Sequence, residues 1–187
     1  MTTVFLSGSR SISRLNDAIR QRVWPMIEKG FRIVVGDANG ADKSMQMFLA
    51  EKKYENVVVF CSGQNCRNNI GNWPTKKIEV NLKLKGRDFF AQKDKAMASE
   101  ADYGLVLWDG KSMGTVNNML ELLKHNKPVA AYFMPGKEFY SLKRVGDLQK
   151  LFKHCDGRNY RNMMQLISFQ EQAAESDSSL RQRSFHW

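Results

Sequence analysis

The chain has 187 residues, of which 42% are hydrophobic and 26% charged, a composition typical of a soluble globular protein with one domain and an extension. No apolar run approaches the roughly 18 residues of a membrane-spanning helix, and the first residues lack the pattern of a signal peptide, so we expect a cytoplasmic protein with no membrane partner. The net charge of +10 favours anionic partners such as nucleotides or nucleic acid.

Strands and helices are predicted to alternate from the first residues onward. Short continuous apolar runs, typical of buried parallel strands, occupy residues 4–6, 31–35, 56–61, 103–108 and 128–133. Helical spacing of apolar residues marks 13–29, 42–53, 89–99 and 115–125, and we expect Ser13 to cap the first helix and Gly30 to end it. This order predicts an α/β fold, a Rossmann-like three-layer sandwich with a central parallel sheet of about five strands.

Residues 62–84 interrupt this alternation with a stretch rich in glycine and asparagine. A loop this long within a compact domain is usually functional or mobile. Its tryptophan, Trp73, has two interpretations: a lid that closes over a ligand's base, or an anchor that fixes the loop to the sheet. Trp108, at the end of a buried strand, is expected in the core, although its edge could also stack on a base.

The carboxyl-terminal part has a different character. Residues 139–152 and 160–169 are predicted to be helical, and from Ala174 the chain becomes polar, then basic and aromatic, which is typical of a disordered tail. The sequence therefore predicts a Rossmann-like domain at 1–135, a helical extension at 136–173 and a disordered tail at 174–187.

The three cysteines, Cys61, Cys66 and Cys155, are expected to be reduced thiols, because their number is odd and no export signal precedes them. The spacing of Cys61 and Cys66 is too loose for a zinc site, and no second cysteine pair lies nearby. We therefore expect no metal ion and no cofactor.

Three glycine-rich turns follow three of the predicted strands, each just before a helix. Such a turn directs backbone N–H groups and the positive end of a helix toward one point, which suits a phosphate. In a parallel sheet all three turns would meet at the carboxyl edge, where open α/β sheets bind ligands. The turns contain Gly8, Ser9 and Arg10; Gly36, Asp37, Gly40, Ala41 and Asp42; and Asp109, Gly110, Lys111, Ser112, Gly114 and Thr115.

Individual residues in these turns suggest separate roles. Arg10 could offer a planar fork of donors to a phosphate or be a solvated residue before a helix. Asp37 is placed to accept hydrogen bonds from ribose hydroxyls, and Asp42 to cap its helix or contact the ligand. Lys111 with the hydroxyls of Ser112 and Thr115 would form a phosphate cradle, which is the clearest predicted site in the chain.

The first two turns, Gly8-Ser9-Arg10 and Gly36-x-x-x-Gly40-Ala41-Asp42, resemble those of the SLOG superfamily, which includes the lonely-guy phosphoribohydrolases and the DNA-processing protein A fold. The third turn is similar to the lonely-guy Pro-Gly-Gly-x-Gly-Thr element, and Lys93-Asp94-x-x-Met97 to the Arg-Lys-x-x-Met segment before it. The resemblance covers residues 4–133. It implies a Rossmann-like fold, phosphate and ribose binding that includes Lys93, and a homodimer or other homo-oligomer.

One position departs from the lonely-guy pattern. Asn118 stands where those enzymes have a glutamate, and an amide cannot exchange a proton near neutral pH. We therefore expect Asn118 to contact a nucleotide or nucleotide-derived ligand, such as a signalling nucleotide, without hydrolysing it. Two alternatives stay open. One is a nucleotide N-glycosidase that uses Asp94, Asp109 or Glu121. The other is nucleic-acid binding like that of DNA-processing protein A. The positive net charge supports nucleic-acid binding, but the basic residues are scattered along the sequence, which does not favour it.

Overall fold

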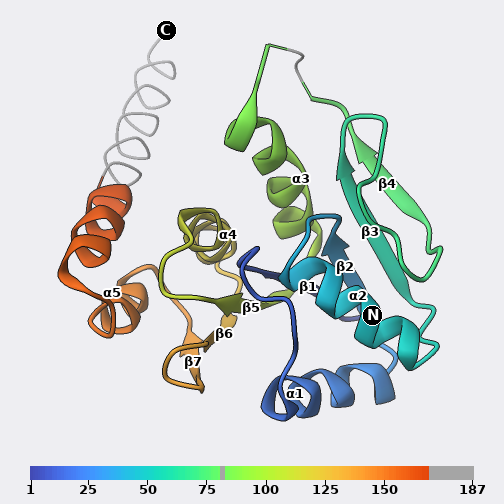
Figure 1. The fold of residues 1–187 in the computed structure, drawn as a ribbon, viewed down its shortest axis with the longest axis horizontal. Helices are drawn as coiled ribbons and strands as arrows, with labels where there is room; N and C mark the ends of the chain where they lie inside the picture. The colour runs from blue at the N-terminus through green and yellow to red at the C-terminus, as the bar shows by residue number, and fades with distance from the viewer. Residues whose placement is uncertain (81–82, 169–187) are drawn as a thin grey trace, which may run out of the picture.

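The computed structural model describes residues 1–80 and 83–168, which form a sheet of seven strands between layers of helices (Figure 1). The elements in chain order are β1 (Thr3–Gly8), α1 (Asp17–Glu28), β2 (Arg32–Gly36), α2 (Ala41–Glu51), β3 (Val57–Ser62), β4 (Thr75–Ile78), α3 (Gly86–Glu100), β5 (Tyr103–Trp108), α4 (Met113–Lys124), β6 (Val129–Phe133), β7 (Glu138–Leu142) and α5 (Gly146–Phe152). Residues 157–168 add a further helical segment.

The strand order β4-β3-β2-β1-β5-β6-β7 places β1 at the centre of the sheet. The strands from β4 to β6 pair in parallel, and only β7 is antiparallel, on β6. Leu6 of β1 lies opposite Val35 of β2 on one side and Leu105 of β5 on the other. The predicted Rossmann-like α/β sandwich is confirmed, with seven strands instead of about five.

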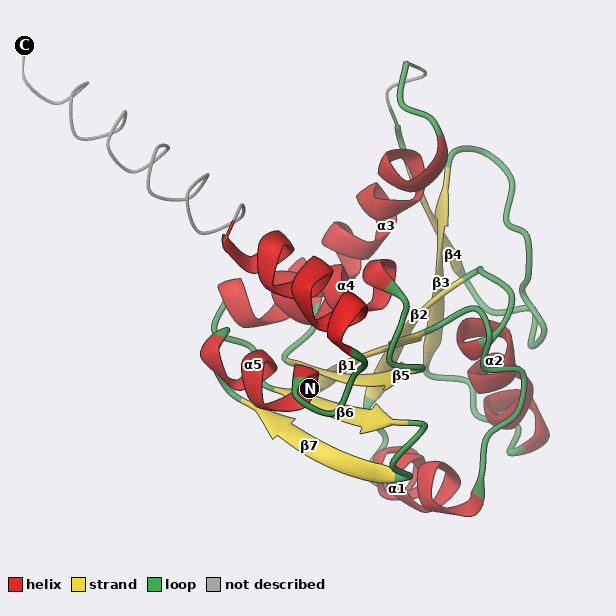
Figure 2. Cartoon of the chain, turned by 60° about the vertical axis from the view of Figure 1, so that its left-hand side comes forward, coloured by secondary structure: helices red, strands yellow, loops and turns green. Residues whose placement is uncertain are grey.

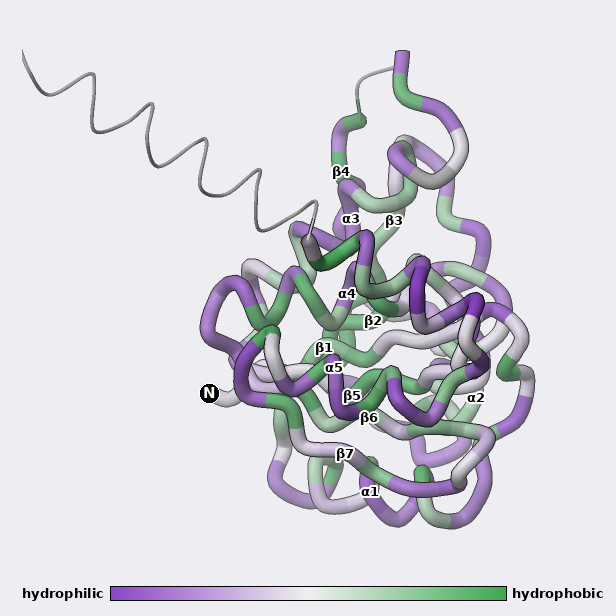
Figure 3. The backbone as a smooth tube through the Cα atoms, turned by 90° about the vertical axis from the view of Figure 1, so that its left-hand side faces the viewer, coloured by the Kyte–Doolittle hydropathy of each residue, from purple (hydrophilic) through white to green (hydrophobic). Residues whose placement is uncertain are grey.

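The two faces of the sheet pack against different helices because the side chains of a strand alternate between faces. Val4, Leu6 and the residues in register with them pack on α1 and α2, whereas Phe5 and Val106 pack on α3, α4 and α5. Figure 2 shows the two helical layers on opposite sides of the strands, and in Figure 3 hydrophobic colour runs through the central strands. Within the described residues, no helix has the length and apolar character needed to cross a membrane.

Two strands were not predicted. β4 lies in the expected loop at 62–84, where Thr75-Lys76-Lys77-Ile78 pairs with the end of β3. The predicted helix at 139–152 is wrong in its first part, because a turn at 134–137 sends the chain back as β7 alongside β6. The second part is α5, and helix 157–168 accounts for most of the prediction at 160–169. The predicted tail at 174–187 lies outside the described residues.

Two local predictions are also corrected. Asn16 caps α1 in place of Ser13, since its side chain accepts a hydrogen bond from the Ile19 N–H at 3.0 Å. Cys61 and Cys66 form a disulfide, because the chain turns back after β3 and brings their Cα atoms to 5.2 Å, a separation that a disulfide spans. Of the predicted thiols, Cys155 remains free.

Candidate functional site

A cleft of about 560 Å³ opens at the carboxyl ends of the central strands. It lies beside β1 and β5, where the strand order changes direction and open α/β sheets bind ligands. Its lining comes from the end of β1, the segments after β2, β3 and β5, and one side of α3. The lining residues are Ser7, Gly8, Arg10, Ala38, Asp42, Arg67, Gly86, Phe90, Ala91, Lys93, Asp94, Lys111, Ser112, Met113, Gly114, Thr115, Asn117 and Asn118.

Hydroxyl groups join the first turn to the third. The Ser9 hydroxyl, fully buried, lies 3.1 Å from the Thr115 hydroxyl and accepts a hydrogen bond from the Asp109 N–H at 3.1 Å. The Ser11 hydroxyl, just after the first turn, donates a hydrogen bond to Asp109 Oδ2 at 2.6 Å. Ser9 and Asp109 therefore hold the two turns together, and neither lies in the lining of the cleft.

The third turn presents the start of α4 to the cleft. Asp109 Oδ1 accepts from the N–H groups of Lys111 at 3.0 Å and Ser112 at 2.8 Å, and Ser112 Oγ caps the helix by accepting from the Thr115 N–H at 3.3 Å. Burial disfavours the charged form of Asp109, but the hydrogen bonds from the Ser11 hydroxyl and from the N–H groups of Ser112 and Lys111 outweigh it and lower the pKa of Asp109. Because the first N–H groups of a helix lack partners within it, those of Met113 and Gly114 can serve an anion in the cleft.

The floor of the cleft holds a buried lysine between two carboxylates. Lys93, 2% exposed, places Nζ 2.7 Å from Asp94 Oδ1 and 3.9 Å from Asp42 Oδ2. Burial raises the pKa of Asp42 to about 6, against the opposing effect of Lys93. Gly36 makes room for this group, since a Cβ there would lie 2.3 Å from Asp42 Oδ2 and 2.6 Å from Lys93 Nζ.

Asn118 connects this floor to β1. When its amide is oriented by its neighbours, Oδ1 accepts from the Ser7 hydroxyl at 2.7 Å, and Nδ2 donates to Asp94 Oδ2 and to the Gly114 carbonyl, each at 3.2 Å. A neutral amide thus lies beside an acidic side chain from α3.

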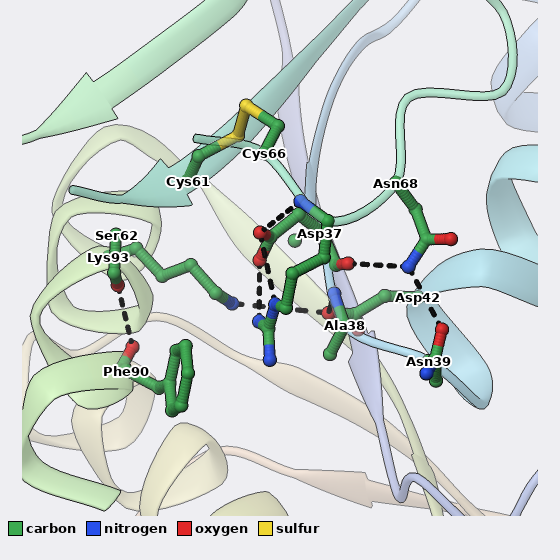
Figure 4. A network of polar contacts seen from close by, with 12 residues as sticks. Asp37, Ala38, Asn39, Asp42, Cys61, Ser62, Cys66, Asn68, Phe90 and Lys93 are labelled. Carbon is green, nitrogen blue, oxygen red and sulfur yellow. Dashed lines mark hydrogen bonds and ion pairs between the residues drawn. A yellow bond between two sulfur atoms is a disulfide. The ribbon is translucent and has the colours of Figure 1, made fainter. Parts of the chain in front are cut away.

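Asp37 is buried, 1% exposed, and belongs to a second ion pair. Arg67, from the segment after β3, donates to it through Nε at 3.1 Å, Nη2 at 2.6 Å and its backbone N–H at 3.0 Å. Burial alone would raise the pKa of Asp37, but the bonds from Arg67 lower it. Figure 4 shows Asp37 near Asp42 and Lys93, with the Cys61–Cys66 disulfide at the edge of the same group.

The structure brings nine of the predicted site residues into the lining of the cleft. These are Gly8, Arg10, Asp42, Lys93, Lys111, Ser112, Gly114, Thr115 and Asn118. The others lie behind it: Ser9, Gly36, Asp37, Gly40, Ala41, Asp109 and Gly110. Asp42 does not cap α2, because Gly40 is the N-cap and the Asp42 carboxylate accepts from the Ala38 N–H at 3.2 Å; its contact with a ligand stays a prediction.

The tryptophans take structural positions. Trp73 is 7% exposed, packs in the core on the side of α1 and α2, and donates from Nε1 to the Tyr54 carbonyl at 2.8 Å. It is the anchor of the loop, and the interpretation as a lid is wrong. Trp108 is fully buried in the core on the other face.

Sequence reasoning missed three functional candidates in the cleft, Arg67, Phe90 and Ser7. Ser7 belongs to the first glycine-rich turn but was not among the predicted site residues, and Phe90 lies in a predicted helix without belonging to a motif. Arg67 carried one weak signal, its position next to Cys66 in an unusually long loop.

Within residues 1–80 and 83–168, no group of three or more His, Cys, Asp or Glu side chains could hold a metal ion.

Comparisons with known protein families and with curated proteins find no match. Among solved structures, the chain is similar to DNA processing protein A from Helicobacter pylori, whose structure is described as giving insight into a unique mode of single-stranded DNA binding. The two share 14% sequence identity with a TM-score of 0.54, over 89% of this chain and 80% of that one. At this identity the similarity is one of fold.

Proposed function

We propose that the cleft binds a nucleotide or nucleotide-derived ligand, with a phosphate at the start of α4. One observation supports this most directly: the first turn of α4 lines the same cleft as the side chains of Arg10 and Lys111. Helix N–H groups, hydroxyls and cations together favour a phosphate over a neutral ligand. Membership of the SLOG superfamily, with its nucleotide-sensing branch, is part of this proposal.

The carboxylates on the floor of the cleft make this part chemically different from the phosphate site proposed at the start of α4. Asp42 and Asp94 flank Lys93, so the cation there is already compensated and a phosphate gains little from approaching it. Carboxylate oxygens are instead good acceptors for sugar hydroxyls. A ligand with a phosphate at one end and a hydroxylated sugar beside it therefore fits this arrangement.

A thermal-shift panel of mono-, di- and cyclic nucleotides and ADP-ribose tests the proposal. A ligand present at 100 times its dissociation constant should stabilise the fold by about 2.7 kcal/mol. The absence of a shift for every ligand of the panel, with calorimetry in agreement, would refute it.

Gly114→Val tests the position of the phosphate. A Cβ at 114 would make only an ordinary contact, 3.9 Å from Ser112 Oγ, so the fold should persist while the branched side chain obstructs the helix start. Calorimetric titration should show at least about a tenfold loss of nucleotide affinity. Gly146→Val, at the start of α5 where a Cβ meets nothing within 4 Å, is the matched control. Equal affinity in Gly114→Val and wild type would remove the third turn from the site.

A second candidate function is the binding of single-stranded DNA. It is favoured by the fold similarity to DNA processing protein A and by the net charge of +10. Binding of an oligothymidylate should then weaken steeply as salt rises, because neutralising phosphates releases counterions. Nucleotide binding without any oligonucleotide binding would eliminate this candidate.

An N-glycosidase is the third candidate, and the position of Asp94 is what favours it. Of the three carboxylates considered, Asp94 lines the cleft, whereas Asp109 binds turn N–H groups and Glu121 lies 3.4 Å from His125. Since Asp94 is engaged by Lys93, we expect no release of free base from nucleoside monophosphates over hours. Multiple-turnover release that is lost in Asp94→Asn would establish the enzyme instead.

A further inference from the structure

Arg67 and Phe90 form a stacked pair in the lining of the cleft. The guanidinium carbon of Arg67 lies 4.2 Å from the centre of the Phe90 ring. The Arg67 side chain is 34% exposed, whereas Asp37, which it binds, is 2% exposed and lies outside the lining. Asp37 therefore sits behind the guanidinium, and the pair with Phe90 faces the cleft.

The contacts of Arg67 fix the plane of its guanidinium. Nε and Nη2 donate to the two oxygens of Asp37, and the backbone N–H of Arg67 donates to the same carboxylate. A bidentate arginine–carboxylate pair has little rotational freedom, because both groups are planar and share two parallel bonds. The Phe90 ring and the buried carboxylate together hold the group in one orientation.

The contacts with Asp37 also reduce the attraction of the Arg67 guanidinium for an anion. The Asp37 carboxylate, 2.6 Å from Nη2, compensates most of the charge of Arg67. What remains is a flat, rigid surface whose charge is already paired with Asp37, and guanidinium planes of this kind stack on nucleobases. Arg10 and Lys111 at the start of α4 are better placed to bind phosphate.

The pair also lies at a suitable distance from the proposed phosphate site. Arg67 follows β3, and the third turn follows β5, which is three strands away in the sheet. Three strand spacings amount to about 14 Å between main chains, and the long Arg67 side chain shortens the gap. A sugar between the two ends would lie over Asp42 and Asp94.

We infer that Arg67, oriented by Asp37 and backed by Phe90, is the platform on which the nucleobase of the bound nucleotide stacks. The inference rests on the proposed nucleotide binding and extends it to the base. Asp37 is then a positioning residue, which corrects the expectation that it contacts ribose. Lysine could not replace Arg67, since an ammonium group has charge but no plane.

The test compares AMP with ribose 5-phosphate, which has the same phosphate and sugar but no base. Calorimetry should show that wild type binds AMP more tightly, and that Arg67→Lys loses at least about fivefold of AMP affinity while its affinity for ribose 5-phosphate changes less than about twofold. Arg20→Lys is the matched control, because Arg20 lies over Phe48 at 5.2 Å, away from the cleft. Asp37→Asn should also reduce the preference for AMP over ribose 5-phosphate. If the substitution at the buried Asp37 prevents folding, the comparison of Arg67→Lys with wild type still tests the inference.

The other outcomes overturn the inference in distinguishable ways. An unchanged preference for AMP in Arg67→Lys would refute the platform and leave the proposed function intact. Equal losses for both ligands would make Arg67 a phosphate-binding charge. Loss of oligothymidylate affinity with unchanged AMP affinity would assign the stack to a nucleic-acid strand. Failure of wild type to bind either small ligand would refute the proposed function itself.

Discussion

Replacing Asp42 by asparagine should change how the stability of the protein depends on pH. The Asp42 carboxylate is 5% exposed, and its nearest cation, Lys93 Nζ, lies 3.9 Å away and is shared with Asp94. Burial raises the pKa of Asp42 from 3.8 to about 6 in the folded protein. Asparagine has nearly the same shape, can still accept from the Ala38 N–H, and does not ionise.

The sign and size of the effect follow from proton linkage. Between pH 4 and 6 the folded state holds a proton at Asp42 that the unfolded state has released, so the free energy of unfolding falls as pH rises through this range. A shift of about two pKa units corresponds to about 3 kcal/mol. Asp42→Asn lacks this dependence. Because the Asp42 carboxyl of the unfolded chain is already mostly ionised at pH 4, wild type should lose about 2.4 kcal/mol of this relative to the variant between pH 4 and 7.

Urea denaturation of both proteins at half-unit steps from pH 4 to 7 measures this difference. Asp109, whose pKa is lowered, produces the opposite slope and contributes equally to both proteins, so it cancels in the difference. Asp37, whose pKa is also lowered, interacts with Asp42, so its contribution cancels only in part. Parallel stability curves would show that Asp42 titrates normally and would refute the account of the cleft floor. A difference that grows as pH falls would indicate that Lys93 outweighs burial.

Three further substitutions test features of the fold by denaturation. Gly40→Ala should lower the free energy of unfolding by about 3 kcal/mol or more, because Gly40 has φ +82° and a Cβ there would lie 2.2 Å from the backbone oxygen of Arg10. The control Gly146→Ala should cost under about 1 kcal/mol, and equal costs for the two variants would contradict this account. Cys61→Ser should cost about 2 kcal/mol by opening the loop to Cys66, and excess dithiothreitol should produce the same loss in wild type but none in the variant. Trp73→Phe should cost about 1–3 kcal/mol and leave nucleotide affinity unchanged; a tenfold loss of affinity would restore its role as a lid.

The alternation of apolar runs and helical segments was sufficient to predict the architecture and the edge of the sheet that carries the cleft. Each buried parallel strand has a strong local signal, and each turn follows its strand directly, so the convergence of the turns is a consequence of topology. β4 had no such signal. Three of its four residues are exposed, and Lys76 and Lys77 interrupt any apolar pattern. The hairpin of β7 was missed because its residues also fit helical spacing.

The details of the cleft depend on contacts between distant parts of the chain. Asp37 and Arg67 are 30 residues apart, and nothing local to either indicates that they pair. Asn118 and Asp94 meet because α3 and α4 pack side by side on one face of the sheet. Motifs therefore identified residues near the ligand site, while the partner of each charged group required the folded chain.

The two outer strands of the sheet affect how copies of the chain could associate. An outer strand has backbone N–H and C=O groups on one side that are available to a strand from another molecule. On β4 the exposed side chains of Lys76 and Lys77 lie on opposite faces beside this edge. Antiparallel addition of a second β4 with residue 76 opposite residue 77 would bring lysines of the two copies together, although Lys76 is also paired with Glu100. Such repulsion disfavours a continuous sheet across two molecules. The predicted homo-oligomer would then form through the helical layers or the edge of β7, and the ordinary hazard of strand-by-strand aggregation is reduced at the β4 edge.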